Sequence, residues 1–263
     1  MQQLRYFLLA AGLFLVMGCY EITEEISING DGSGTYSTKM DMSALIEMMQ
    51  SMAGEKELGK DGLDRPLDTL IMLKDVMDSV KNLTPEQREL YHDGSMNLQM
   101  NLDEKIFKFN MSFPYKDRTQ LKTFMSGGGA RGMPEVFKRV YRTSPDSTGN
   151  GSGNDSEKAP ADEGFDMINS IFDISVADGK VSKQLNKQKY QELMLRPEVT
   201  QAREMSKANQ EVPYTTIIKF PRPVKKTDNR LIKLSADKKT ATIKYNLLTL
   251  FETPEKFSYT IVY

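Results

Sequence analysis

The sequence predicts an α+β protein: a curved antiparallel β-sheet built of hairpins, with helices packed on one face and one disordered insertion. Many segments alternate apolar and polar residues, which is typical of half-buried strands. Others place apolar residues three and four positions apart, which is typical of amphipathic helices. Hydrophobic residues make up 39% of the chain and charged residues 27%, which indicates a folded body rather than a disordered one.

The first strand is expected over residues 21–29, where Ile22, Ile26 and Ile28 alternate with polar residues. A turn at 30–34 and a returning strand at 35–40 complete a hairpin. The clearest hairpin pairs 96–102 with 107–113, each with one apolar and one polar face. Two further hairpins and two single strands are predicted over these ranges: 172–176 with 180–185 around an Asp178-Gly179 type I′ turn, 231–234 with 240–245, 213–220, and 257–263.

Helices are expected between these strands. One follows Ser43, with an apolar face that includes Met48, Met49 and Met52. A second opens at Pro66 and carries apolar residues from Leu67 to Val80. Thr84 begins a third with a capping box, and short helices are also predicted after Asp117, over 133–141, over 187–195 and over 199–205, with a helical or irregular link at 247–251.

The chain is expected to divide at a segment of low complexity. Residues 144–164 contain no aromatic or branched aliphatic side chain and should be a disordered linker or insertion. Residues 1–18 are expected to be a separate leader segment, for the reasons given below. Residues 19–143 form an N-terminal α+β half, and 165–263 form a C-terminal α+β half that shares one sheet with the first.

The glycine-rich run Gly30-Asp31-Gly32-Ser33-Gly34 has two interpretations. A phosphate-binding loop needs a helix N-terminus behind it, and the P-loop motif ends in lysine and serine or threonine. This run instead joins two alternating segments and lacks the lysine. A hairpin turn is therefore favoured.

Residues 6–17 are all apolar or glycine, and Arg5 is the only charge before Glu21. A membrane-spanning helix needs about 20 apolar residues, so this run has the length of a signal-peptide core. It ends in Leu15-Val16-Met17-Gly18-Cys19, which resembles the lipobox of bacterial lipoproteins. An ordinary secretory signal with a chance cysteine and a buried hydrophobic helix are the alternatives.

The resemblance implies cleavage between Gly18 and Cys19 and attachment of lipid, including palmitate, to Cys19. Cys19 is also the only cysteine of the chain, and lipidation would explain an otherwise free thiol. Residue 20 is tyrosine rather than the aspartate that retains some lipoproteins at the inner membrane. We therefore expect a lipid anchor in the bacterial cell envelope, at the outer membrane, on either its periplasmic or its surface face.

Known catalytic and metal-binding patterns are missing from the sequence. His92 is the only histidine; it is read as a solvated residue at a helix end rather than a base oriented by Asp93, because adjacent side chains rarely face each other. One histidine and one cysteine cannot make a zinc site of the usual kind. Most acidic residues lie at polar positions of strands and helices. We expect no catalytic residue, no metal and no cofactor; a carboxylate-based hydrolase is the least favoured alternative.

The chain contains 17 methionines. Methionine is flexible and is frequent on adaptable apolar binding surfaces. Met48, Met49, Met52, Met72 and Met77 are thus a candidate apolar ligand face, although core packing beneath amphipathic helices is the simpler interpretation.

The start of the body is similar to uncharacterised lipoproteins of Bacteroidota, in which a strand after the cysteine leads into a turn such as Asn29-Gly30-Asp31-Gly32-Ser33-Gly34. A weaker likeness links it to LppM-type lipoproteins, whose soluble part is a candidate lipid binder. The formal net charge of −1 gives no case for nucleic acid. The expected function is non-enzymatic binding of an envelope protein or a lipid ligand, or else a structural role in assembling the outer membrane.

Overall fold

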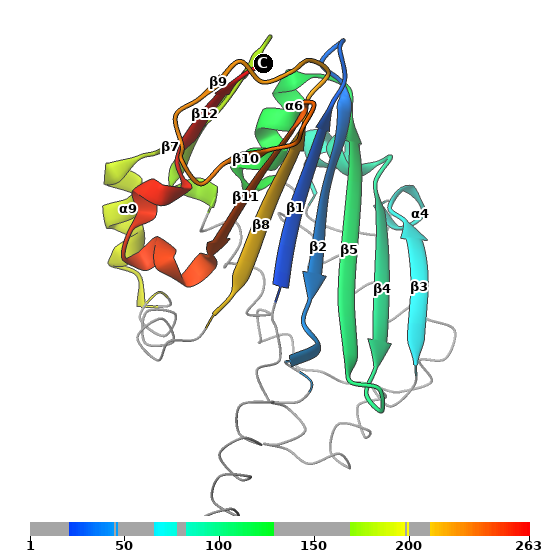
Figure 1. Cartoon of the computed structure of the whole chain (residues 1–263). Coiled ribbons are helices and arrows are strands. Elements are labelled where there is room, and N and C mark those ends of the chain that lie inside the picture. Colours follow the sequence, from blue (N-terminus) through cyan, green and yellow to red (C-terminus); the bar gives the residue numbers. More distant parts are fainter. Residues whose placement is uncertain are drawn as a thin grey trace, which may run out of the picture.

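A computed structural model describes residues 21–44, 46, 66–77, 83–128, 169–197, 199 and 211–263. Its main features are an eight-stranded and a four-stranded β-sheet with short helices between strands (Figure 1). The predicted α+β class is confirmed. The signal peptide, Cys19 and the predicted linker at 144–164 lie outside the described residues.

The strands are β1 (Glu21–Ile28), β2 (Gly34–Asp41), β3 (Leu67–Met72), β4 (Ser95–Asn101), β5 (Ile106–Tyr115), β6 (Phe172–Ala177), β7 (Lys180–Leu185), β8 (Pro213–Lys219), β9 (Lys226–Thr227), β10 (Lys233–Leu234), β11 (Thr240–Asn246) and β12 (Tyr259–Val262). The helices are α4 (Lys74–Met77), α5 (Pro85–Tyr91), α6 (Arg118–Thr123), η2 (Phe124–Gly128), α9 (Lys187–Met194), η3 (Leu247–Phe251) and η4 (Pro254–Phe257).

The large sheet has the order β10-β11-β8-β1-β2-β5-β4-β3, with β1 in its interior. β1 pairs antiparallel with β2 and parallel with β8, whereas the other pairs of this sheet are antiparallel. Strands from both sides of the 144–164 segment therefore lie in one sheet. The small sheet has the order β6-β7-β12-β9 and was not predicted as a separate layer.

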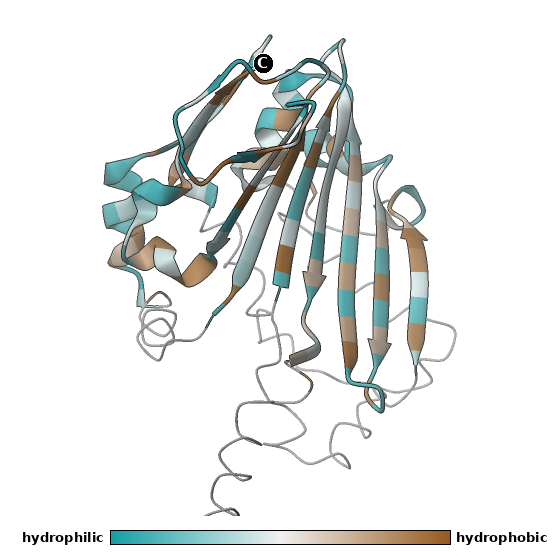
Figure 2. Ribbon diagram, viewed as in Figure 1, coloured by the Kyte–Doolittle hydropathy of each residue, from teal (hydrophilic) through white to brown (hydrophobic). Residues whose placement is uncertain are grey.

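Alternation along the strands separates the two faces of the large sheet. In β5, Phe109, Met111 and Phe113 are buried while Lys108 is exposed and Asn110 is half-buried. Figure 2 shows the resulting apolar and polar bands along β4 and β5. Because one face is buried and the other polar, each hairpin has a defined register.

The core lies between the two sheets and the helices that join them. Ile26 from β1 and Ile261 from β12 are fully buried in the same apolar cluster. Phe124, just after α6, stacks on Tyr36 of β2 and on Phe113 of β5, with ring centroids 5.4 and 5.1 Å apart. Such aromatic contacts fix the covering layer on the large sheet.

One predicted helix is wrong. Leu67–Met72 is a strand, and among the described residues of that segment only Lys74–Met77 is helical. The apolar residues of this segment fit both the periodicity of a helix and that of a strand. Pairing of all six residues with β4 decides in favour of the strand, because a local pattern cannot reveal which neighbour supplies hydrogen bonds.

The Asp178-Gly179 turn is present but is not of type I′. The strands pair up to Ala177 and Lys180, and only Gly179 has a positive φ, 70°. A type I′ turn would require positive φ at both central residues. The hairpin predicted over 172–185 is otherwise confirmed.

The predicted capping box of α5 is confirmed. The Thr84 hydroxyl accepts a hydrogen bond from the Gln87 amide at 3.2 Å, and the Gln87 side chain accepts one from the Thr84 amide at 2.9 Å. Each bond satisfies a backbone donor that the helix leaves free.

Replacing Thr84 with alanine should lower the free energy of unfolding by about 1 kcal/mol, because the Gln87 amide loses its acceptor. Thr84→Ser keeps the hydroxyl and should change stability much less. Urea unfolding monitored by circular dichroism measures both variants; equal destabilisation of the two would contradict a capping role.

Candidate functional site

The residues predicted to form an apolar ligand face do not come together in the part that the structure describes. Met77 is buried in the core, whereas Met72 is 38% exposed on β3. Met48, Met49 and Met52 lie outside the described residues, as do Gly18 and Cys19. Methionine count alone could not distinguish core filling from a surface.

A buried carboxylate in β1 is the most unusual polar feature of the interior. Glu24 is 3% exposed and lies on the same face of β1 as Ile22 and Ile26. The Tyr36 hydroxyl donates to Glu24 Oε1 at 2.9 Å, and the Thr216 hydroxyl donates to Oε2 at 3.2 Å. Each carboxylate oxygen thus has a partner, as burial of a charge requires.

Lys183 of β7 brings a buried cation into the same layer. It is 4% exposed; its Nζ donates to Asn169 Oδ1 at 3.1 Å and lies 4.5 Å from the centre of the Phe172 ring. Burial lowers the pKa of Lys183, and the negative charge of Glu24 partly offsets that shift. The two charges act through space, one on each sheet, rather than as a direct ion pair.

Buried tyrosines surround Glu24. Burial raises the pKa values of Tyr36, Tyr214, Tyr245 and Tyr259 above the ordinary 10.0, and the Glu24 charge raises them further. Tyr115, whose hydroxyl donates to the Ser27 carbonyl, is also raised, chiefly by burial. The phenols are therefore held neutral as hydrogen-bond donors and packing groups.

Alkaline unfolding is expected from these tyrosines. A pKa that is raised on folding contributes stability below the unfolded value and loses it as pH rises through the folded value. The stability should thus fall above about pH 10, where unfolded tyrosines ionise. Because burial lowers the pKa of Lys183, its own contribution to stability increases as pH rises toward its ordinary pKa. Lys183 is a single group, however, whereas five tyrosines have raised pKa values. Tyrosinate absorbance rising together with loss of circular dichroism would support this; tyrosinate forming in the folded protein would contradict it.

The cluster draws on both sheets, because Glu24 and its partners come from β1, β2 and β8 and Lys183 comes from β7. Glu24 is the only buried acidic residue in the described ranges, so no second carboxylate faces it there. His92 is 60% exposed at the end of α5, as predicted, although contrary to expectation its Nδ1 does lie 2.7 Å from the Oδ1 of neighbouring Asp93. No group of three or more potential metal ligands occurs within the described part of the chain.

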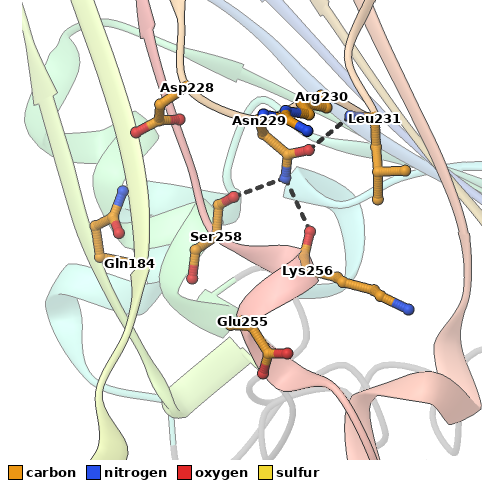
Figure 3. Close-up of a pocket in the computed structure, with 8 residues that line it drawn as sticks. All are labelled: Gln184, Asp228, Asn229, Arg230, Leu231, Glu255, Lys256 and Ser258. Atoms are coloured by element: carbon orange, nitrogen blue, oxygen red, sulfur yellow. Dashed lines mark hydrogen bonds between the residues drawn. The ribbon is translucent and has the colours of Figure 1, made fainter.

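An open pocket of about 420 Å³ lies beside the small sheet (Figure 3). Its lining residues come from β7, the loop after β9, η4 and the residue between η4 and β12: Gln184, Asp228, Asn229, Arg230, Leu231, Glu255, Lys256 and Ser258. Asn229 links the loop after β9 to η4 and to Ser258, the residue that follows η4. Its Nδ2 donates to the Lys256 and Ser258 carbonyls at 2.9 and 2.7 Å, and its Oδ1 accepts from the Leu231 amide at 2.8 Å.

The pocket offers charges of both signs but no activated nucleophile. The Ser258 hydroxyl accepts the Leu185 amide at 3.0 Å, and no histidine lies in the lining. A hydroxyl nucleophile needs an adjacent base. The exposed charges and polar groups of this lining can contact a polar molecule.

Sequence reasoning missed Glu24, although the signal was available. Ile22, Glu24, Ile26 and Ile28 share one parity in an alternating strand, so Glu24 had to lie on the apolar face. The neighbouring Glu25, of opposite parity, is on the polar face and pairs with Lys219. Burial of Lys183 was harder to predict from the sequence, because Val181, Ser182 and Lys183 are three consecutive buried residues and do not follow the alternation of a strand.

None of the helices in the described residues is both long and apolar enough to cross a bilayer. No protein-family model, no curated protein and no solved structure matches this chain.

Proposed function

We propose that the protein is a lipoprotein of the bacterial envelope, held through lipid on Cys19, whose folded body binds a partner without catalysing a reaction. The observation that carries the proposal is the position of β1. This interior strand of the large sheet begins at Glu21, so only Tyr20 separates it from the lipobox cysteine.

The short connection determines how the body meets the membrane. With a single residue between them, the Cα atoms of Cys19 and Glu21 can be at most roughly 7 Å apart. The first residues of β1 and of its parallel neighbour β8 would then face the bilayer, and the Gly30–Gly34 turn would lie at the far end of the sheet. Figure 1 places the C-terminus near that far end as well.

The interior supports binding through the surface rather than catalysis. Glu24 and Lys183 are enclosed between the sheets and hydrogen-bonded to protein groups. The open pocket at Asn229 lacks a nucleophile with its base. A partner protein is favoured over an apolar ligand because Met77 and its neighbours fill the core.

Labelling of the full chain with a palmitate analogue tests the anchor. Wild-type protein should take up label and sediment with membranes, whereas Cys19→Ser should take up none and lose its firm attachment. Multiple acyl chains give stable attachment, while none leaves only weak contacts. Gly18→Ala keeps a small residue before the cysteine and should label as wild type. Equal membrane retention of Cys19→Ser would refute the proposal.

A further inference from the structure

The only buried lysine and the only buried asparagine in the described ranges are in contact with each other. Lys183 Nζ donates a hydrogen bond to Asn169 Oδ1 at 3.1 Å, and the two residues are 4% and 8% exposed. Since Cγ of Asn169 is one bond away from that oxygen, the amine nitrogen lies within about 4.3 Å of Cγ. An amine and a carboxamide therefore meet in a site shielded from solvent.

Both side chains extend from backbone that is held in place. Lys183 of β7 pairs with Tyr259 of β12, which is 2% exposed, so Lys183 lies on the inner face of the small sheet. The Asn186 amide donates to the Ile171 carbonyl at 2.8 Å, which ties the end of β7 to the segment that carries Asn169. Two groups held at short range react as if they were highly concentrated.

The surroundings of Lys183 favour a neutral amine. Its Nζ lies 4.5 Å from the centre of the Phe172 ring, and Phe172 is itself 3% exposed. Burial lowers the pKa of Lys183, although the charge of Glu24 partly offsets that shift. The neutral form is the one with a lone pair, and a desolvated lysine is an activated nucleophile for this reason.

We propose that Lys183 and Asn169 join through an amide bond between their side chains. The Nζ attacks Cγ, a new bond forms between these two atoms, and the bond from Cγ to Nδ2 breaks. Of the three protons on the lysine ammonium, one stays on the new amide and two leave with Nδ2, which departs as ammonium. No electron is transferred, so the reaction needs no oxidant. The structure shows the hydrogen-bonded state that precedes the bond.

Glu24 is suited to carry one of the two protons. It is the only buried acid in the described ranges, and its charge acts on Lys183. Hydrogen bonds from Tyr36 and Thr216 hold the carboxylate in the layer between the sheets. Because the two charges are not in direct contact, the transfer passes through one water or follows a small movement of the lysine chain. Glu24 then gives the proton to the departing Nδ2 and ends unchanged.

The bond is a cross-link of a kind that needs no cysteine. Cys19 is the only cysteine, so no disulfide can form within the chain. The joined residues are 14 positions apart and enclose β6 and the turn into β7 in a closed loop. A cross-link restricts the unfolded chain, and a neutral amide is less costly to bury than an ammonium. The buried charges of Glu24 and Lys183 thus describe the protein before the reaction.

Peptide mapping of the purified full chain tests the proposal. The protein is denatured, digested with trypsin and analysed by mass spectrometry. Without the bond, trypsin cuts after Lys183 as it does after the exposed Lys180. With the bond, Lys183 is no longer cut, and residues 159–180 stay attached to residues 181–187. We expect this joined peptide, lighter by one ammonia than its two parts, from most of the protein.

Substitutions separate the reaction from packing. Lys183→Arg keeps a cation that cannot form the bond, and Asn169→Ala removes the carbon that is attacked, so neither should give the joined peptide. Asn169→Asp should give a joined peptide of the wild-type mass, because loss of water then yields the same amide. Glu24→Gln should lower the joined fraction at least about tenfold, whereas Tyr36→Phe keeps the carboxylate and should not. Circular dichroism verifies that each variant folds.

Complete cleavage after Lys183 in the wild type, with no joined peptide, would overturn the proposal. A joined peptide in Asn169→Ala would also overturn it, because the lysine would then have another partner. Equal joined fractions in Glu24→Gln and Tyr36→Phe would contradict the part assigned to Glu24. The bond does not depend on the lipid anchor, so Cys19→Ser should give the same joined peptide as wild type.

Discussion

Replacing Gly34 with alanine is expected to lower the free energy of unfolding by about 3 kcal/mol or more. A Cβ at this position would lie 1.9 Å from the Ser27 carbonyl oxygen and 2.4 Å from the Tyr115 hydroxyl oxygen. Ser27 belongs to β1, which pairs with β2 at this point, so its backbone cannot move without breaking the ladder. The Tyr115 hydroxyl donates to that same carbonyl at 2.7 Å.

Gly30 offers a matched control in the same hairpin. A Cβ there would meet nothing within 4 Å, so Gly30→Ala should change stability by less than about 1 kcal/mol. Urea unfolding of the two variants and the wild type gives the comparison. Similar stabilities for Gly34→Ala and Gly30→Ala would show that the hairpin relaxes and that the close contacts are not limiting.

Replacing Glu24 with alanine should be comparably damaging. The change leaves Lys183 as a buried charge without the opposite charge across the layer, and it removes the acceptor of the Tyr36 and Thr216 hydroxyls. Leaving a buried hydroxyl such as that of Tyr36 without its acceptor costs about 1–3 kcal/mol, and the lost attraction to Lys183 adds to that cost. Glu25→Ala on the polar face, where the carboxylate pairs with Lys219, should cost at most about 1 kcal/mol.

A double-mutant cycle with Lys183→Met tests whether the two buried charges are coupled. Methionine keeps an unbranched chain of similar length and removes the charge. If Glu24 and Lys183 stabilise each other, the double variant should be destabilised by clearly less than the sum of the single variants. Additive effects would instead indicate that each charge is satisfied by its own neighbours.

Every strand predicted from alternation is present, apart from the boundaries of the shortest, but β3 and β9 were not predicted as strands. The alternation of apolar and polar residues over 96–102 and 107–113 predicted β4 and β5 correctly. Each strand buries one face, so every second residue must be apolar. The caps at Thr84 and Asp117 were also visible, since each side chain satisfies nearby backbone donors. Features governed by neighbouring residues were thus accessible from the sequence.

Features that depend on pairing between distant segments could not be predicted from the sequence. β3 resembled a helix until its partner β4 was known, and the division into two sheets depends on β12 joining β7 rather than β11. Of the polar cluster, Glu24 could be placed on the buried face by parity alone. Its meeting with Tyr36 and Thr216 required the register of three strands, which no local pattern contains.

The parallel pairing of Ile22 with Tyr214 and of Ile26 with Ile218 has a consequence for the order of assembly. During synthesis, β1 finds its second neighbour, β8, only after the whole segment between them, residues 29–212, has been made. Contacts of such long sequence separation slow folding and lengthen the lifetime of incompletely paired intermediates. In a chain truncated before Pro213, the side of β1 that pairs with β8 would stay unpaired. We expect such a chain to aggregate and to be readily cleaved by proteases.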